Sequence, residues 1–486
     1  MKKIKFILFF ATMLCLTVVC VSCTKPAVPE DSTTRYDLCL SLDGNTLSAS
    51  QEVRFFNFTG SELDEIKFHL YPNAYRGDAS FPACDPEDSL CYYDGFDTGG
   101  IDIEKCFADG TASDYTLSEN MQILSVPLDK PLGKGEEIYI GFQYTVTVPK
   151  TNSRFGITEN GVNLANFYPQ LCVFENGAFS EYPYYQNGDP FYSECADYFL
   201  EFSTTSDTAF ASTGELTDSF VQDGKYYYQA EARNVRDLAV CLIDNGTVIT
   251  QRVGATDVNY VYFNDLSPEL SLQTAVEAVQ TFGEYFGDYN LSDLNVVQTD
   301  FIHGGMEYPG LVYISSFQKD AAYRYTIVHE IAHQWWYGAV GSDPVANPWQ
   351  DEGLTEFCTA LFYKLNGNAA AFDAVISSAM NSYSSARSEA EKQGLTFGSM
   401  RLKSYEFDSS DIYVVSTYDR GMLMFNSLYL AMGEKAFLTA LGDYFRSYNG
   451  KIAAPDDMKA CFEAGKPGAS TIIDNWLDDK VYAAGA

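Results

Sequence analysis

The sequence predicts an α+β protein of two domains, with strands in its first half and mostly helices in its second. In residues 138–148, bulky apolar side chains stand at every second position, which is typical of a strand with one buried face. In residues 272–286, apolar side chains recur at intervals of three and four, which is typical of an amphipathic helix. The change from the first period to the second lies near residue 265.

We expect the first domain, residues 35–250, to be an antiparallel β-sandwich or saddle. Leu38, Leu40 and Leu42 alternate with other residues ahead of an Asp-Gly-Asn turn, and Pro149 ends the later alternating run. Short strands separated by turns that contain Gly and Pro are typical of such sheets.

We expect the second domain, residues 251–486, to be rich in helices. Ser267 can cap a helix that has Pro268 at its first position. The chain has mostly helical periodicity from about residue 323 onward. Two strands are expected between these helical parts, at residues 294–301 and 311–315.

The composition excludes several classes of protein. Of the 486 residues, 46% are hydrophobic and 15% are aromatic, so the chain is not disordered, collagen-like or a coiled coil. It has 66 acidic and 31 basic residues, and the net charge is 31 − 66 = −35. Nucleic acids and anionic membrane surfaces are bound by clustered Lys and Arg, so this charge argues against both as partners.

The N-terminus has the pattern of a lipoprotein signal peptide. Three lysines lie in the first five residues, and an apolar run of about 14 residues follows, from Phe6 to Val19. This run is short for a membrane span but typical of a signal-peptide core. Small residues before Cys23 resemble a bacterial lipobox, although Cys20 stands where Leu is commonest.

We therefore expect residues 1–22 to be a signal peptide, Cys23 to be lipidated, and residues 23–34 to form a linker. This would place the protein outside the cytoplasmic membrane, with a lipid anchor in the cell membrane. Two alternatives remain open, namely ordinary secretion with cleavage near Ser22 and an uncleaved anchor.

The most specific motif is an HExxH pattern made by His329, Glu330 and His333, and it contains two of the four histidines of the chain. Residues four apart lie on one face of a helix, so both imidazoles can bind one metal ion while Glu330 lies beside it. The alternative is a helix with two histidines that are bonded within the protein.

A zinc site of this kind needs a third protein ligand, and Glu352 is the candidate. Asn347 as cap and Pro348 at the first position predict a second helix that carries Glu352 in its first turns. Asp351 and Glu356 lie near enough in sequence to orient the two histidines. The alternative is that these two are solvated carboxylates at a helix N-terminus.

The spacing of HExxH, eighteen residues and then Glu352 in a Trp-x-x-Glu-Gly context resembles the gluzincin zinc aminopeptidases, the family of aminopeptidase N and leukotriene hydrolase. The resemblance covers about residues 35–480. It implies a thermolysin-like catalytic domain after the β domain, and one zinc ion per chain held by His329, His333 and Glu352, with Glu330 as the catalytic base.

A second hallmark of this family, Gly-x-Met-Glu-Asn, is similar to the segment from Gly304 to Tyr308, where Tyr replaces the Asn. The resemblance implies that Glu307 binds the α-ammonium of the substrate, and that Gly304, Gly305 and Met306 also belong to the substrate-binding site.

A third hallmark, Tyr-Glu-Lys-Gly, is similar to Tyr418 and the three residues after it. The resemblance implies that Tyr418 is catalytic and donates a hydrogen bond to the developing oxyanion. Tyr413 is the alternative for this role.

Together these features predict a zinc aminopeptidase that hydrolyses N-terminal residues from peptides with a free N-terminus. One alternative is a zinc endopeptidase or another zinc hydrolase that uses the same site. Glu307 argues against it, because a carboxylate at the end of the pocket favours a free amine. A second alternative is a catalytically inactive surface lipoprotein that only binds, which the intact HExxH motif, Glu352 and Tyr418 argue against.

The twelve cysteines do not form an obvious framework of disulfides. Three of them lie at residues 15, 20 and 23, and the nine that remain are an odd number, so at least one is unpaired. No two of the nine are spaced as CxxC, so we expect no cysteine-ligated metal. Cys84 and Cys91 can close a short loop, whereas most of the others are expected to be small buried side chains.

Overall fold

We describe a computed structural model of the protein, which defines residues 33–394 and 397–480. These described residues group into one compact unit. The predicted signal peptide, most of the predicted linker and the predicted lipidation site Cys23 lie outside the described residues. No helix in the described part of the chain combines the length and the apolar character needed to cross a membrane.

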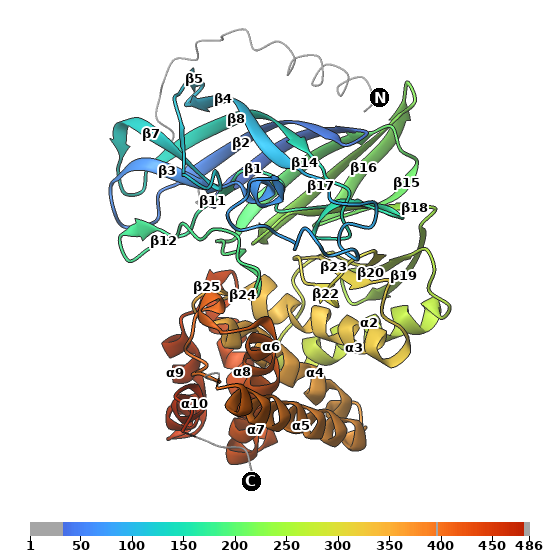
Figure 1. The fold of residues 1–486 in the computed structure, drawn as a ribbon, viewed down its shortest axis with the longest axis vertical. Coiled ribbons are helices and arrows are strands. Elements are labelled where there is room, and N and C mark those ends of the chain that lie inside the picture. Colours follow the sequence, from blue (N-terminus) through green and yellow to red (C-terminus); the bar gives the residue numbers. More distant parts are fainter. Residues whose placement is uncertain (1–32, 395–396, 481–486) are drawn as a thin grey trace. The chain divides into compact units, whose positions relative to one another are not determined.

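The first half of the described chain consists of β-sheets, drawn in blue to green in Figure 1. The largest sheet has eight strands in the order β16-β17-β14-β1-β2-β8-β4-β5. Its strands are β1 (Arg35–Asp43), β2 (Thr46–Phe56), β4 (Gly100–Ala108), β5 (Thr111–Ala112), β8 (Glu137–Thr147), β14 (Ala196–Thr204), β16 (Glu215–Gln222) and β17 (Lys225–Val235).

Two four-stranded sheets and a small hairpin accompany this large sheet. The first consists of β15 (Thr208–Ser212), β18 (Ala239–Asp244), β10 (Gly161–Ala165) and β9 (Phe155–Thr158). The second consists of β11 (Gln170–Leu171), β3 (Leu63–His69), β7 (Ile123–Leu132) and β6 (Thr116–Leu117). The hairpin is formed by β12 (Phe174–Glu175) and β13 (Ala178–Phe179).

The alternating sequences form the strands that were predicted. In β1 the leucines at 38, 40 and 42 are buried, and the strand turns back at Gly44, whose φ of +58° suits glycine. In β8 every second residue is buried as well, and the strand ends two residues before Pro149. One pair departs from the predicted antiparallel arrangement, because β1 and β14 run parallel. These strands lie far apart in sequence, so no hairpin forces them to run in opposite directions.

The second half, in yellow to red in Figure 1, begins with a five-stranded sheet and continues as helices. The sheet consists of β19 (Thr247–Val253), β20 (Thr256–Tyr262), β21 (Asp293–Thr299), β23 (Leu311–Ser315) and β22 (Gly305–Met306), in that order. The helices are α2 (Pro268–Phe286), α3 (Asp320–Ala332), α4 (Leu354–Leu365), α5 (Ala369–Gln393), α6 (Ser410–Val414), α7 (Arg420–Met432), α8 (Glu434–Tyr448), α9 (Pro455–Gly465) and α10 (Ala469–Leu477).

Most of these elements agree with the sequence. Helix α2 begins at Pro268 as predicted, but the side chain of Ser267 does not cap it. Asp265 instead accepts hydrogen bonds from the Ser267 backbone and from the Ser271 hydroxyl, at 2.9 and 2.6 Å. The predicted strand 311–315 is β23, while the other, β21, ends at Thr299, two residues earlier than predicted. The domain boundary at residue 250 stays a prediction.

Three short π-helical turns interrupt the helical half, and two of them carry Glu352 and Tyr418. They are η2 (Gln334–Ala339), η3 (Trp349–Gly353) and η5 (Val415–Asp419), and they follow α3, precede α4 and precede α7. Such turns are rare and are frequent at functional sites.

Arg236 joins the β-rich half to the helical half. Its guanidinium is buried and donates to the carbonyls of Ser193, Tyr337 and Ala339 at 3.0, 2.7 and 3.3 Å, and also to that of Lys451. Three of these four carbonyls belong to the helical half. This buried side chain is therefore one of several contacts between the two halves, and it lies beside the segment that follows α3.

Candidate metal centre and substrate cavity

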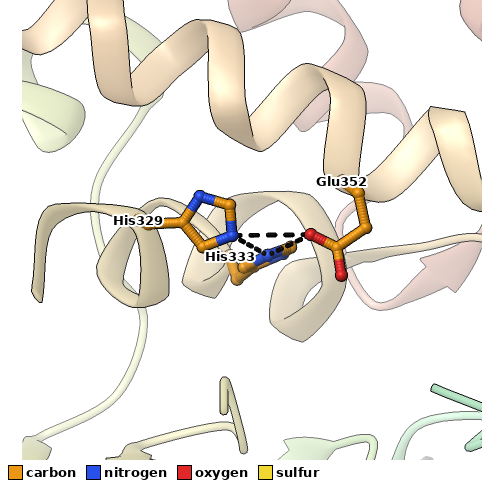
Figure 2. A group of neighbouring side chains, drawn as sticks. All are labelled: His329, His333 and Glu352. Atoms are coloured by element: carbon orange, nitrogen blue, oxygen red, sulfur yellow. Dashed lines mark hydrogen bonds and ion pairs between the residues drawn. The ribbon is translucent and has the colours of Figure 1, made fainter. Parts of the chain in front are cut away.

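The three predicted metal ligands converge in the structure. His329 lies in α3, His333 follows α3 directly with helical backbone angles, and Glu352 comes from η3, facing the histidines as Figure 2 shows. The two Nε2 atoms are 3.1 Å apart, and Oε2 of Glu352 lies 3.4 Å from that of His329 and 3.2 Å from that of His333. All three side chains are buried.

The arrangement fits a zinc ion. Nδ1 of His333 lies 2.8 Å from a carboxylate oxygen of Asp351 and 3.2 Å from the carbonyl of Trp336, so a proton on Nδ1 directs the lone pair of Nε2 toward the other ligands. Two lone pairs of neutral imidazoles at this short separation repel each other unless a cation lies between them. Two nitrogens and one oxygen are the ligand set of zinc sites that keep a position open for water or substrate.

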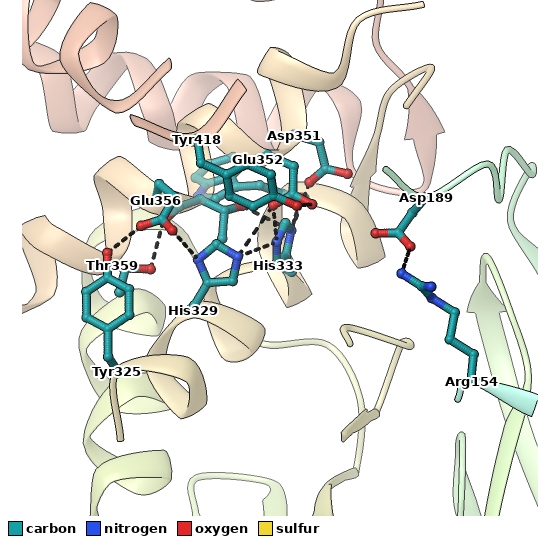
Figure 3. Close-up of polar contacts among 12 residues, drawn as sticks. Arg154, Asp189, Tyr325, His329, His333, Asp351, Glu352, Glu356, Thr359 and Tyr418 are labelled. Carbon is teal, nitrogen blue, oxygen red and sulfur yellow. Dashed lines mark hydrogen bonds and ion pairs between the residues drawn. The ribbon is translucent and has the colours of Figure 1, made fainter. Parts of the chain in front are cut away.

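Asp351 and Glu356 were expected to orient the histidines, and only Asp351 lies within hydrogen-bond distance of one. Asp351 contacts His333, whereas the Glu356 oxygen nearest to Nδ1 of His329 is 3.7 Å away, which is longer than a hydrogen bond. The other oxygen of Glu356 accepts a hydrogen bond from the hydroxyl of Tyr325 (Figure 3).

Glu330 points into the space beside the metal ligands. It is buried, its Oε2 has no hydrogen-bond partner, and burial raises its pKa to about 7. Strand β22 passes directly against it, since a Cβ on Gly305 would overlap Oε1 of Glu330. A side chain at residue 305 would therefore displace the Glu330 carboxylate from this position.

Glu307 follows β22 and is also buried. Its carboxylate groups with Glu330 and His333, and separately with Glu352 and Asp189, with ligand atoms in each group within 4.8 Å of one another. Burial raises the pKa of Glu307, and the neighbouring carboxylates raise it further, while His333 opposes them. Glu307 is thus a buried carboxyl group whose charged form is disfavoured unless a cation binds beside it.

The side chain of Gln334 holds the backbone around Glu307 in place. Its amide nitrogen donates to the carbonyls of Glu307 and Tyr308, both at 3.3 Å, and its oxygen accepts from the backbone of Gly310 at 2.8 Å. Gly304 lies in the cavity wall, and Met306 is buried in the core of the β-rich half.

Tyr418 lies in η5, and its hydroxyl donates to Oε1 of Glu352 at 2.7 Å. Tyr413 lines the same cavity, with its ring centroid 6.5 Å from that of Tyr418. Two glycines, Gly353 in η3 and Gly421 at the start of α7, make the approach of Tyr418 possible, because a Cβ on Gly421 would lie only 2.6 Å from Cα of Gly353.

Sequence reasoning missed Asp189 and Arg154, which come from the β-rich half. Asp189 lies in the cavity wall and pairs with Arg154, as the dashed line in Figure 3 marks. Arg154 also donates to the Tyr184 hydroxyl and contacts the sulfur of Met306, both at 3.2 Å. The sequence offers no signal for these roles beyond a turn at Asn-Gly-Asp-Pro, since no motif links residue 189 to residue 352.

The cavity between these residues has a volume of about 410 Å³. Among the residues that line it, Arg154 is the only Lys or Arg, and it is already paired. Five carboxylates line it: Asp189, Glu307, Glu330, Glu352 and Glu356. This excess of negative charge favours the binding of a metal ion and of a substrate that carries a positive charge.

Comparison with known proteins identifies the helical half. Residues 270–476 match the Peptidase family M1 domain. Aminopeptidase M1-B of Oryza sativa subsp. japonica is 26% identical over 234 residues, which cover 44% of this chain and 26% of the rice protein. Human aminopeptidase Q is 26% identical over 164 residues, which cover 32% of this chain and 16% of that protein. The similarity therefore spans about a quarter or less of these relatives.

Solved structures match over nearly the whole chain. An M1 zinc metallopeptidase from Deinococcus radiodurans is 17% identical, with a TM-score of 0.66 over 93% of this chain and 94% of that one. At this identity the likeness shows a common fold, namely a β-rich domain followed by a helical domain. The ligands His329, His333 and Glu352 form the His-His-Glu triad typical of zinc-binding M1 peptidases. Residues 270–476 of this chain are therefore similar to the peptidase family M1 domain.

Proposed function

We propose that the protein is a zinc-dependent aminopeptidase that holds one zinc ion and removes N-terminal residues from peptides. The observation that carries the proposal is the position of Glu307, a buried carboxylate within 4.8 Å of Glu330 and His333 in the cavity of the metal ligands. The names of the relatives support it. One structure of the Deinococcus radiodurans enzyme holds a Tyr-Ser-Ala substrate; that chain is 16% identical, with a TM-score of 0.64.

The residues of the cavity account for hydrolysis of a peptide bond. When bound, zinc supplies a Lewis acid that polarises the scissile carbonyl and makes water more acidic. Glu330 takes a proton from the attacking water and passes it to the nitrogen of the leaving amine. The Tyr418 hydroxyl turns from Glu352 to donate a hydrogen bond to the oxyanion as it forms.

Two carboxylates account for selection of a free N-terminus. Glu307 accepts hydrogen bonds from the α-ammonium of the substrate, and Asp189 adds a second negative charge from the β-rich half. The pair with Arg154 keeps Asp189 in the cavity wall. An acetylated amine carries no charge, so it offers no cation to the buried carboxyl group of Glu307.

The test is a panel of aminoacyl chromogenic peptides, each with a free and an acetylated N-terminus, with and without a chelator. We expect cleavage of the free form only, about one zinc per chain by elemental analysis, and activity that returns when zinc is added back after chelation. Equal cleavage of acetylated peptides and of internal bonds would establish an endopeptidase instead. Absence of bound zinc and of any cleavage would reject the proposal altogether.

We also propose that the enzyme is anchored outside the cytoplasmic membrane by a lipid on Cys23. The signal-like sequence of residues 1–22 supports this location, and those residues lie outside the described part of the structure. The full-length protein should partition into detergent, and Cys23→Ser should release it or leave it unprocessed. An unmodified N-terminus at another residue would show that the lipobox assignment is wrong.

A further inference from the structure

Two cysteines in the long segment between β3 and β4 lie in contact. Cys84 and Cys91 are 5% and 0% exposed, and each thiol is the side-chain hydrogen-bond partner of the other. Six residues lie between them, and all except Asp88 are exposed. The segment therefore forms a loop whose middle faces solvent and whose two ends meet at buried thiols.

Backbone hydrogen bonds fold this loop into successive turns, and its two ends contact neighbouring residues, Cys84 at Ser153 and Cys91 at Asn152. Asp88 donates from its backbone to the carbonyl of Asp85 at 3.0 Å, and Tyr92 donates to that of Asp88 at 2.9 Å. The side chain of Asp88 accepts from the backbone of Leu90 at 2.8 Å. These turns keep the thiols together without a covalent bond, so little chain entropy remains to be lost when one forms.

The surroundings do not suggest a metal site. Among the described residues, no third His, Cys, Asp or Glu forms a ligand group with this pair. Other cysteines have different partners, such as Cys241, whose sulfur lies 3.3 Å from the side-chain oxygen of Asn163. The sulfur of Cys84 lies 3.5 Å from the hydroxyl of Ser153, the residue before Arg154.

We propose that Cys84 and Cys91 are a disulfide-forming pair, oxidised by a small-molecule or protein disulfide as the chain folds. One thiolate attacks a sulfur of the incoming disulfide, so a mixed disulfide forms and one thiol leaves. The second thiolate then attacks the mixed disulfide and releases the other thiol. Two S–H bonds are lost and one S–S bond forms, and the incoming disulfide takes up the two electrons and the two protons.

Cys84 is the better attacking group. Its hydrogen bonds with Cys91 and Ser153 and the charge of Arg154 lower its pKa against the effect of burial, whereas the pKa of Cys91 is raised. The bond would also stiffen the support of the cavity wall. The backbone of Asn152 donates to the carbonyl of Cys91 at 2.9 Å, and Arg154 follows two residues later.

The experiment uses the full-length protein, unfolded and refolded with glutathione disulfide or with a reductant, then unfolded again and alkylated without further reduction. Cleavage after Glu87 separates Cys84 and Cys91 into two peptides. We expect these peptides to be joined in the oxidised sample, about 2 Da lighter than their sum because two hydrogens are lost. Reduction should separate them again.

Controls in the same sample distinguish this pair from general oxidation. Cys39 and Cys461 are partly exposed and should be alkylated in both samples. In Cys91→Ser, Cys84 should carry a glutathione adduct, because no second thiol can displace it. Alkylation of Cys84 and Cys91 in the oxidised wild type, to the extent seen for Cys39, would overturn the proposal, as would a bond from either to another cysteine. The readout is a mass, so the result is independent of peptidase activity.

Discussion

Glu330 stands next to a metal ligand in sequence, yet its Oε2 has no hydrogen-bond partner among the described residues. A buried carboxylate oxygen without a partner is free to accept a proton or a hydrogen bond from a reacting molecule. Glu330→Gln removes the base but no metal ligand, so zinc should stay bound while kcat falls by about 10²–10⁴. Elemental analysis and steady-state kinetics check this. Loss of zinc from the variant would mean that Glu330 supports the metal, and a kcat near that of wild type would exclude it as the base.

Tyr418 and Tyr413 line the same cavity, but of the two only Tyr418 donates a hydrogen bond to a metal ligand, which is Glu352. Tyr418→Phe should retain zinc and lower kcat by about 10² or more, as for a lost oxyanion donor, with little change in KM. Tyr413→Phe serves as the matched control and should keep most of kcat. The reverse result would assign the catalytic role to Tyr413.

Glu307 is predicted to make the enzyme specific for a free amine. Glu307→Ala should reduce kcat/KM on free-amine peptides by tens to thousands of times, because a loss of about 2–5 kcal/mol is typical when one partner of a buried charged pair is removed. Glu307→Asp should be intermediate, because its shorter carboxylate does not reach as far. Kinetics on matched free and acetylated peptides measure the effect, and a proportional loss on both would show that Glu307 only shapes the cavity.

At the scale of elements, the turn that carries Glu352 meets the start of α7 through two glycines. Gly421→Ala places a methyl group 2.6 Å from Cα of Gly353 and should push the two elements apart. We expect about 1–3 kcal/mol lower free energy of unfolding and a reduced kcat, since Tyr418 moves away from Glu352. Denaturant unfolding and kinetics report both effects.

The control for this variant is another helical glycine. Gly283 in α2 has nothing within 4 Å of an added Cβ, and Ala is favoured over Gly in helices by about 0.5–1 kcal/mol. Gly283→Ala should therefore be neutral or stabilising and leave kcat unchanged. If both variants behave alike, the contact of the two glycines does not govern the site.

At the scale of the whole molecule, the cavity needs both halves, because Arg154 and Asp189 come from one and the metal ligands from the other. Arg236 joins these halves, and Arg236→Met would remove its hydrogen bonds to four carbonyls, of which those of Ser193 and Tyr337 are buried. We expect a free energy of unfolding lower by about 3–5 kcal/mol and a higher KM. Denaturant unfolding and kinetics check both.

Arg233 provides the comparison for Arg236, since it lies three residues away with its side chain 55% exposed. It pairs with Asp197 and Glu231 near the surface, so Arg233→Met should cost less than about 1 kcal/mol. Equal effects of the two substitutions would refute the role of Arg236 in holding the halves together.

Short-range patterns determined much of this protein from the sequence alone. A period of two predicted the strands β1 and β8, and a period of 3.6 predicted the helix that begins at Pro268. A spacing of four residues predicted that His329 and His333 share one face of a helix. Such periods indicate which side chains share one face of a helix or strand. This sharing is decided within a single element, so it can be predicted from the local sequence. Glu352 followed from the need for a third ligand and the predicted second helix, whereas Tyr418 needed the family resemblance, because no short period connects it to the histidines.

Only the tertiary structure decided how the separate elements meet. The parallel pairing of β1 with β14, the contact between Gly353 and Gly421 and the charge pair of Asp189 with Arg154 all join residues that lie far apart in sequence. The energy of each contact depends on distance and burial in the folded chain, and neither is encoded in the local pattern of either partner. The sequence alone therefore predicted the metal ligands, while the cavity wall opposite them came from packing between the two halves.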